Sequence, residues 1–264
     1  MLNEKPYYEV PLNHDDPLVV LDRLERYRSV DLRRITVEEL INLTADTLPC
    51  ILHKGWTYPK GVKLYRVRKK DTSDQMFRTT SEVSYCPEKF VKTIGRFNNE
   101  KESILYTSTD SITPFHEVKA EIDDEFALVE FETLSNLNLT DVCLGTELPF
   151  RLTINGEINH KIIEQFLFTE FTKDVGVGTE FLYKVTVSLA KMLLNVPGSQ
   201  GIRYPSTPFK QGINVAIEKD AVDEKLKVIS VKNVKVKDIL LDGRILCDIQ
   251  SESKTINKDG TIIY

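Results

Sequence analysis

The spacing of apolar residues changes near residue 61 of this 264-residue chain. Before that point, apolar residues recur every three or four positions, which is the period of a helix packed along one face. After it, residues 62–68 alternate apolar and polar side chains, as in a strand with one buried face. Because the two periods occupy separate blocks, the chain is expected to combine helices with a sheet.

Two helices are expected before the change of period. Asp16-Pro17 has the order of an N-cap followed by proline at the first helical position. A second helix begins with the capping-box sequence of residues 36–39 and ends before Pro49. Their apolar faces, expected to pack on the rest of the protein or against a partner, comprise Leu18, Leu21, Leu24 and Tyr27 in the first helix and Val37, Leu40, Ile41 and Leu48 in the second.

The remaining chain groups strands and helices without strict alternation. This order favours the α+β class with a largely antiparallel or mixed sheet. Residues 70–93 are expected to be rich in loops, and Asp259-Gly260 to form a late turn. Strands are expected at 62–68, 104–107, 126–131, 213–217, 226–231 and 239–249, and helices begin at Thr113 (through Phe115, Val118 and Ile122), Asn159 and Thr179.

Composition excludes several classes of protein. The net charge of −5 argues against a general nucleic-acid binder, which would carry a basic stripe. No stretch approaches ~18 apolar residues and the N-terminus has no apolar signal region, so we expect a cytoplasmic protein without membrane contact. The cysteines have no C-x-x-C spacing, which argues against zinc and indicates reduced, mostly buried thiols at Cys50, Cys86, Cys143 and Cys247.

Two further motifs lack the context that a cofactor site requires. Gly176-Val177-Gly178 has no third glycine at the right offset and no clear strand before it, so it indicates a turn before the helix at Thr179. The histidines show no metal-ligand spacing, and we expect no metal site; they are His14, His53, His116 and His160.

Five segments carry polar residues that point to a binding site more strongly as a set than each does alone. Arg66 stands in the first strand, where an arginine is most often solvated. Arg96 follows a glycine in a turn from which its guanidinium could hold a phosphate. Glu117 alone could be a surface charge in a first helical turn, and Ser206 alone a turn residue beside Pro205. The fifth segment is Ile104-Leu105-Tyr106.

In order, the motifs YR, GRFN, LYTS, E, GIRYPS and N resemble those of the RES domain, which is named for an arginine, a glutamate and a serine. The resemblance covers residues 59–247, leaving 1–58 as an N-terminal helical extension and 248–264 as a tail or hairpin. One departure is Gln200, where many members carry aspartate. The three naming positions fall on Arg66, Glu117 and Ser206, and the family's other pocket residues fall on Arg96, Tyr106 and Asn214.

The resemblance implies a fold and an activity. RES domains are similar to ADP-ribosyltransferases, with a split mixed β core, flanked by helices, around an NAD⁺ cleft. Members are toxins of bacterial toxin–antitoxin pairs that degrade NAD⁺ by phosphorolysis or hydrolysis. NAD⁺ is then a substrate and no cofactor is implied. Inorganic phosphate stays open as a co-substrate, a neutralising antitoxin protein is the expected partner, and homo-oligomerisation stays open.

The resemblance also assigns roles. The Glu117 carboxylate would stabilise the oxocarbenium-like state formed as the nicotinamide–ribose bond breaks. Arg66 and Arg96 would hold the pyrophosphate or inorganic phosphate. Ser206 would hydrogen-bond the amide or ribose, because no histidine pairs recognisably with it as a nucleophile. The other substrate-binding residues are Tyr106, which would stack on the nicotinamide or its ribose, and Asn214.

Two alternatives remain open. An ADP-ribosyltransferase would use the same cleft but pass the sugar to a macromolecule. A non-catalytic module would keep the fold and use the N-terminal helices as its interface.

Overall fold

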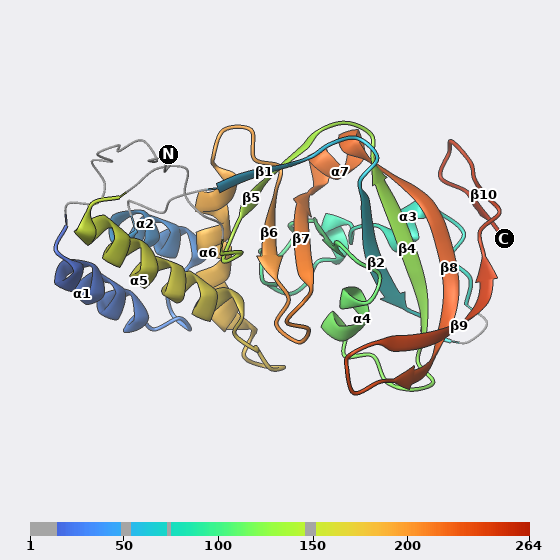
Figure 1. Ribbon diagram of the computed structural model, residues 1–264, viewed down its shortest axis with the longest axis horizontal. Helices are drawn as coiled ribbons and strands as arrows, with labels where there is room; N and C mark the ends of the chain where they lie inside the picture. The colour runs from blue at the N-terminus through green and yellow to red at the C-terminus, as the bar shows by residue number, and fades with distance from the viewer. Residues whose placement is uncertain (1–14, 49–53, 73–74, 146–151) are drawn as a thin grey trace, which may run out of the picture.

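The computed structural model describes residues 15–48, 54–72, 75–145 and 152–264. Within these residues, a nine-stranded mixed sheet is flanked by helices (Figure 1), so the expected α+β class is confirmed. Among the described strands the parallel pair is β5 with β6, and the other neighbours are antiparallel. In spatial order the strands are β1 (Lys54–Tyr58), β5 (Leu137–Asp141), β6 (Gly201–Pro205), β7 (Ile213–Glu218), β3 (Ile104–Ser108), β2 (Lys63–Lys69), β4 (Glu125–Thr133), β8 (Leu226–Ile239) and β9 (Ile245–Glu252).

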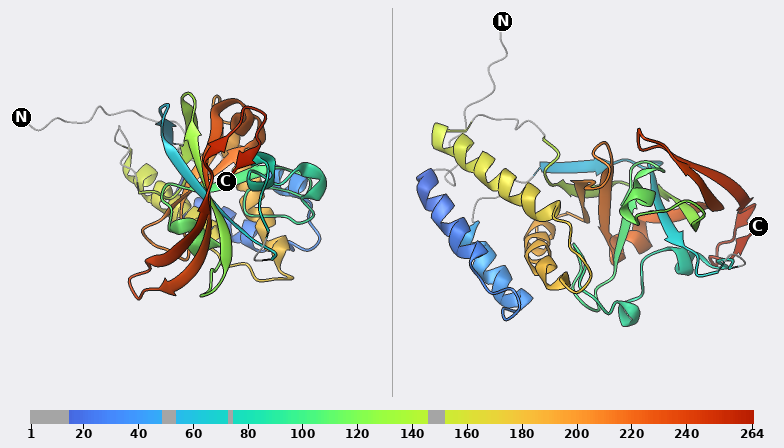
Figure 2. Two further views of the ribbon diagram at one scale, coloured as in Figure 1. Left: turned by 90° about the vertical axis from the view of Figure 1, so that its right-hand side faces the viewer. Right: turned by 90° about the horizontal axis from the view of Figure 1, so that it is seen from below.

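The four longest helices gather at one end of the molecule, beside β5 and β6, whereas the C-terminal strands lie at the other end (Figures 1 and 2). A short hairpin of β10 (Thr255–Ile256) and β11 (Ile262–Ile263) ends the chain around the expected turn at Asp259-Gly260. The helices are α1 (Pro17–Arg28), α2 (Val37–Thr47), α3 (Thr80–Val83), α4 (Thr113–Glu117), α5 (Ile154–Phe171), α6 (Tyr183–Leu194) and α7 (Lys219–Lys225), with 3₁₀ turns η2 (Glu88–Phe90) and η3 (Glu180–Leu182).

Helices α1 and α2 pack on α5 and α6 in one hydrophobic core with β6 and β7. The Asp16 side chain accepts a hydrogen bond from the Leu18 N–H, and Thr36 forms the expected capping box with Glu39. The Tyr27 hydroxyl then joins the layers, because it hydrogen-bonds both Thr44 of α2 (2.9 Å) and Ser188 of α6 (3.1 Å). The N-terminal helices are therefore built into the main core.

The buried face of α1 differs from the expected one. Val20, Leu24 and Tyr27 are buried, whereas Leu18 and Leu21 are 72% and 42% exposed. At 3.6 residues per turn, the three buried residues lie within about 60° of one another and Leu18 points nearly opposite. The face is set by the contact with α5, where Tyr27 meets Phe166 edge-on at 5.7 Å.

The sheet is nearly split between β2 and β3. Within the described residues these strands share one ladder pair, Tyr65 with Ser108. By contrast, β3 forms five pairs with β7, and β2 forms seven with β4. Helix α4 lies beside this junction, in front of the gap between the β7 and β2 ribbons in Figure 1. The two halves of the mixed sheet are thus joined by a single ladder pair of described residues.

Several elements differ from their expected bounds. The helix at Thr113 ends at Glu117 and includes neither Val118 nor Ile122. The expected strand at 239–249 is interrupted by a turn at 240–244, which connects β8 to β9 as a hairpin. Helix α5 begins before Asn159, because Thr153 accepts the capping bond from the Gly156 N–H.

The cysteines and the turn at Gly176 can also be compared with their expected states. Cys86, Cys143 and Cys247 are free thiols, as expected, but they are half-buried and not mostly buried; Cys50 and Pro49 lie outside the described residues. The turn at Gly176 is confirmed by the bond from the Thr179 N–H to the Gly176 carbonyl. Helix α6 begins only at Tyr183, after η3.

The domain boundaries at residues 58 and 247 stay predictions. No helix within the described ranges is long and apolar enough to span a membrane.

Candidate functional site

A cavity of about 570 Å³ opens where the sheet is nearly split. Strands β2, β3 and β7, helix α4 and the loops before β3 and α6 contribute its walls. The cavity brings together five of the six residues singled out in the sequence, and the sixth, Ser206, contacts one of them. The five are Arg66, Arg96, Tyr106, Glu117 and Asn214.

The Glu117 side chain is exposed at the end of α4, but one of its oxygens is held from beneath. Its Oε1 accepts hydrogen bonds from the Ser206 hydroxyl (2.7 Å) and the Asn214 Nδ2 amide (2.5 Å). Both donors are almost fully buried, at 5% and 2% exposure. A carboxylate fixed by two buried donors while still reaching solvent can face a ligand in the cavity.

Ser206 lies in the turn between β6 and β7. Its backbone N–H donates to the Gly212 carbonyl at 2.9 Å, and its Oγ accepts from the Phe209 N–H at 3.2 Å. The Ser206 hydroxyl donates its hydrogen bond to Glu117, and no described histidine contacts the Ser206 oxygen. The Ser206 hydroxyl is therefore engaged as a donor to the Glu117 carboxylate, and no histidine among the described residues is placed to activate it as a nucleophile.

Helix α4 is a single turn whose position is fixed at both ends. The Asp110 carboxylate accepts hydrogen bonds from the backbone N–H groups of Ile112 (2.9 Å) and Thr113 (2.8 Å). At the other end the His116 ring stacks on Phe209, with centroids 4.7 Å apart, and its Nε2 contacts the Gly243 carbonyl at 2.7 Å. The β8–β9 hairpin thus supports the helix that carries Glu117.

Gly243 must be a glycine in this support. Its φ of +87° lies in the left-handed region. A Cβ there would also come within 2.9 Å of the Phe209 ring, which is closer than side chains normally pack. The hairpin can therefore approach Phe209 and His116 only because this position lacks a side chain.

Arg66 bridges the split. Its Nη1 donates to the Tyr106 carbonyl on β3 at 3.1 Å, where the two strands no longer share ladder bonds. Burial, with a smaller contribution from Arg68, lowers the pKa of the guanidinium to about 10. Its Nε is also buried and has no hydrogen-bond partner among the described residues. Because Arg66 lines the cavity and a guanidinium has five N–H donors, the side chain keeps donor capacity for an anion there.

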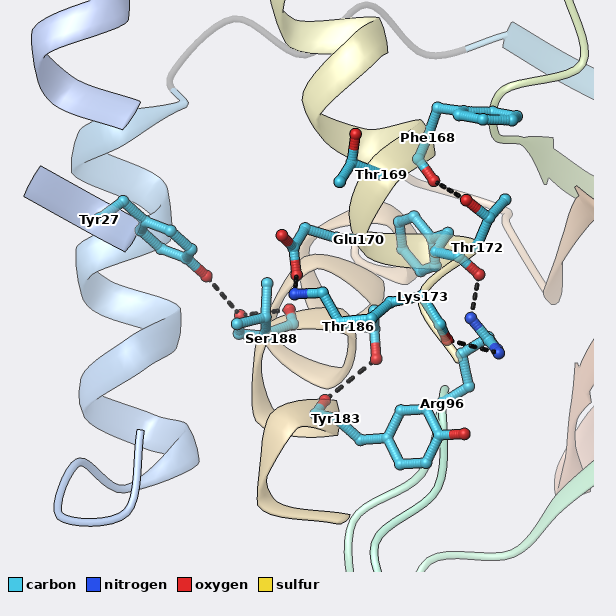
Figure 3. A network of polar contacts seen from close by, with 12 residues as sticks. Tyr27, Arg96, Phe168, Thr169, Glu170, Thr172, Lys173, Tyr183, Thr186 and Ser188 are labelled. Carbon is cyan, nitrogen blue, oxygen red and sulfur yellow. Dashed lines mark hydrogen bonds and ion pairs between the residues drawn. The ribbon is translucent and has the colours of Figure 1, made fainter. Parts of the chain in front are cut away.

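Arg96 is held by the end of a helix. Its guanidinium donates to the backbone carbonyls of Phe171 and Lys173, the latter at 3.3 Å, where α5 terminates (Figure 3). It also lies over the Tyr183 ring, 5.6 Å from the centroid. These contacts suit a cation at a helix C-terminus. Its role in holding phosphate stays a prediction.

Tyr106 is anchored through its hydroxyl. This group accepts the Phe97 backbone N–H at 3.0 Å and donates to the Asn98 side chain at 2.9 Å. Burial is the main reason that the pKa of Tyr106 is raised. Because the hydroxyl is engaged, the ring is the part of Tyr106 that is free to contact a ligand, and stacking on a substrate ring stays a prediction.

One polar residue of the cavity wall could not be singled out from its sequence motif alone. Ser108, the last residue of β3, donates to the Asn214 side-chain oxygen at 2.7 Å. Its only sequence signal is its place at the end of the LYTS motif. His116 also lines the cavity, but its contact with the Gly243 carbonyl gives it a supporting role.

A larger hollow of about 880 Å³ lies elsewhere, between α3, α7 and the β10–β11 hairpin. Its acidic residue Asp223 already accepts from the Tyr85 hydroxyl at 2.8 Å, and Lys219 pairs with Glu88 at 3.1 Å. None of the six residues singled out in the sequence lines this hollow. The smaller cavity, where Glu117, Arg66 and Asn214 meet, is therefore the better candidate site.

No cluster of three or more His, Cys, Asp or Glu side chains that could hold a metal ion occurs in the part of the chain that the structure describes. The polar groups that line the cavity are carboxylates, guanidinium groups, amides and hydroxyls, together with the Lys119 ammonium and the His116 ring.

Comparisons with known proteins give few relatives. No protein-family model matches the chain, and no curated protein matches it in sequence. Among solved structures, the chain is similar to one from the crystal structure of the M. tuberculosis MbcT–MbcA toxin–antitoxin complex. The match has 12% sequence identity and a TM-score of 0.37, and covers 84% of this chain and 93% of that one. A likeness at this score carries no weight for the substrate or partner of the present chain.

Proposed function

We propose that this chain is an NAD⁺-degrading enzyme that cleaves the nicotinamide–ribose bond by phosphorolysis or hydrolysis and acts as a bacterial toxin. The observation that carries the proposal is the exposed Glu117 carboxylate, held through Oε1 by Ser206 and Asn214 at the cavity mouth. The resemblance to RES domains, which places these residues at the family's functional positions, supports the choice of substrate.

The chemistry suits an anchored carboxylate. As the bond between the ribose C1″ and the nicotinamide nitrogen breaks, its electron pair leaves with nicotinamide, and positive charge develops on the ribose. The Glu117 carboxylate can stabilise that charge without reorganising, because Ser206 and Asn214 already fix it. An oxygen of phosphate or water then bonds to C1″, giving ADP-ribose 1″-phosphate or ADP-ribose with loss of a proton.

The remaining cavity residues suit the charged part of NAD⁺. The pyrophosphate carries two negative charges, and guanidinium groups bind such oxygens through paired hydrogen bonds. Arg66 has a buried Nε without a partner, and Arg96 lines the same cavity. We assign the phosphate-binding role to both arginines, with Tyr106 as the surface against which a ring would stack.

The experiment is incubation of the purified protein with NAD⁺, with and without inorganic phosphate, and identification of products by mass spectrometry. Free nicotinamide with ADP-ribose 1″-phosphate would identify phosphorolysis, and free nicotinamide with ADP-ribose would identify hydrolysis. Mass added to a protein present in the assay would instead favour an ADP-ribosyltransferase. Intact NAD⁺ in every condition would contradict the enzyme and favour a binding module. Glu117→Gln protein purified in the same way is the control for contaminating activity.

We also propose a neutralising antitoxin protein as the physiological partner. This part rests on the family resemblance. The N-terminal helices pack into the main core, where Tyr27 hydrogen-bonds Ser188, so they do not form a separate interaction module. A partner would therefore bind a folded unit in which the N-terminal helices and the sheet form one body.

A further inference from the structure

Three polar side chains from three elements form a hydrogen-bonded series along the wall of the cavity. The Ser108 hydroxyl of β3 donates to the Asn214 Oδ1 of β7 at 2.7 Å. The Asn214 Nδ2 then donates to the Glu117 Oε1 of α4 at 2.5 Å. Ser108 and Asn214 are each 2% exposed, so neither exchanges its partner for water.

The sheet itself sets the first contact. Ser108 and Asn214 are directly opposite each other in the β3–β7 ladder, so their side chains lie on one face at neighbouring positions. Ser108 is also the residue where β3 still pairs with β2, through Tyr65, before the sheet splits. Its place is thus fixed from both neighbouring strands.

The series has one direction. An ionised carboxylate only accepts hydrogen bonds, so Asn214 must turn its NH₂ group toward Glu117 and its carbonyl oxygen away. That buried oxygen then needs a donor, and Ser108 supplies it. Without the donor, the amide would leave an oxygen unsatisfied and lose the restraint that aims its NH₂ group.

We infer that Ser108 is a positioning residue for the Glu117 carboxylate and acts through the Asn214 amide. This inference rests on the proposed function, because it concerns the carboxylate to which we assign the stabilisation of the transition state. Ser108 orients Asn214, and its O–H dipole polarises the amide so that the bond to Glu117 is stronger. In this arrangement one hydrogen of the Asn214 NH₂ group is donated to Glu117, and the other can be donated to a ligand.

The kinetic test is a double-mutant cycle on NAD⁺ turnover. Ser108→Ala should lower kcat about 10-fold with little change in KM, since the carboxylate matters most in the transition state. In an Asn214→Ala background the same change should lower kcat less than about 2-fold, because the intermediate side chain is gone. Equal effects in both backgrounds, or full activity of Ser108→Ala, would overturn the inference.

The matched control is Ser188→Ala. Ser188 is also a fully buried serine in a hydrogen-bond network, to Tyr27 and Thr44, but it lies on α6 outside the cavity. Its removal should lower the melting temperature and leave kcat within about 2-fold. A kcat loss in this control equal to that of Ser108→Ala would mean that the effect is general destabilisation.

A second measurement does not depend on the substrate. The side-chain amide signals of Asn214 in a ¹⁵N–¹H spectrum, assigned by their loss in Asn214→Ala, report the bond to Glu117 directly and the bond from Ser108 through its effect on the amide. They should shift and exchange faster with solvent in Ser108→Ala but not in Ser188→Ala. An unchanged Asn214 signal in Ser108→Ala would overturn the positioning role even if the protein did not turn over NAD⁺. A shifted signal in a protein that leaves NAD⁺ intact would contradict only the proposed function.

Discussion

The substitution of Arg66 by lysine tests the cavity's electrostatics through pH. Burial lowers the pKa of the arginine to about 10, so the wild-type guanidinium stays charged through neutral pH. A free lysine titrates near ~10.4, and the same burial would bring it to roughly 8. The Arg66→Lys ammonium should therefore be charged at pH 6.5 and mostly neutral at pH 9.

The size of the expected rise in KM follows from the hydrogen bonds that Arg66→Lys loses. A hydrogen bond to a charged group contributes about 1.5–3 kcal/mol, which corresponds to roughly 10–150-fold in affinity. At pH 6.5 the variant keeps its charge and loses only the planar fork, so KM for NAD⁺ should rise a few-fold. At pH 9 it loses the charge too, and KM should rise by ~10–150-fold relative to the wild type.

The assay is KM for NAD⁺ between pH 6.5 and 9 for both proteins, with melting temperatures at each pH. Arg68→Lys is the control, because Arg68 is on the same strand but lies over the Phe77 ring, 5.7 Å from its centroid, and does not line the cavity. Its KM should follow that of the wild type. If KM of Arg66→Lys kept a constant ratio to the wild type across this range, the buried phosphate-binding role of Arg66 would be wrong.

Three other predictions concern stability, reactivity and toxicity. Burial raises the pKa of the Cys143 thiol to about 12, so at pH 8 only roughly one molecule in 10⁴ carries the reactive thiolate there. A thiol reagent should therefore label Cys143 much more slowly in the native protein than in the unfolded protein, and equal labelling rates would contradict the raised pKa. Thr36→Ala removes the α2 capping box and should cost about 1 kcal/mol of unfolding free energy in urea, whereas an unchanged midpoint would mean that the cap does not stabilise the fold. Expression of the chain without a partner should arrest growth and lower cellular NAD⁺, and robust growth with unchanged NAD⁺ would count against the toxin.

Local signals in the sequence predict the helices and strands that bury the side chains of one face only. The capping box at Thr36 and the alternation in residues 62–68 are of this kind, and the structure has both elements. Strand β1 has no such signal, because three of its five residues are exposed and it lies at the sheet edge. The turn at 240–244 was also missed, since apolar residues on both sides suggest one continuous strand.

The site could be predicted as a set of residues but not as a geometry. Glu117, Ser206 and Asn214 stand out by the order of their motifs, and the structure brings them into hydrogen-bond contact. Ser108 does not stand out, because its significance depends on a partner 106 positions away across the β3–β7 ladder. The hydrogen bonds of Arg96 to the Phe171 and Lys173 carbonyls likewise depend on tertiary packing.

Glu117→Gln tests the central claim most directly. Glutamine keeps a side-chain oxygen that can still accept from Ser206 and Asn214, so the fold and the cavity should persist. What it removes is the negative charge that would stabilise the ribose as the bond to nicotinamide breaks. The measurement is kcat and KM for NAD⁺, with the melting temperature of the same preparation.

The expected result is a kcat lower by about 10²–10³-fold, the scale seen when one preorganised electrostatic group is lost. KM should change little and the melting temperature should stay within a few degrees, since Glu117 is exposed. Full turnover by Glu117→Gln, with or without a lower melting temperature, would contradict the assignment of the catalytic carboxylate and the proposed reaction at this cavity.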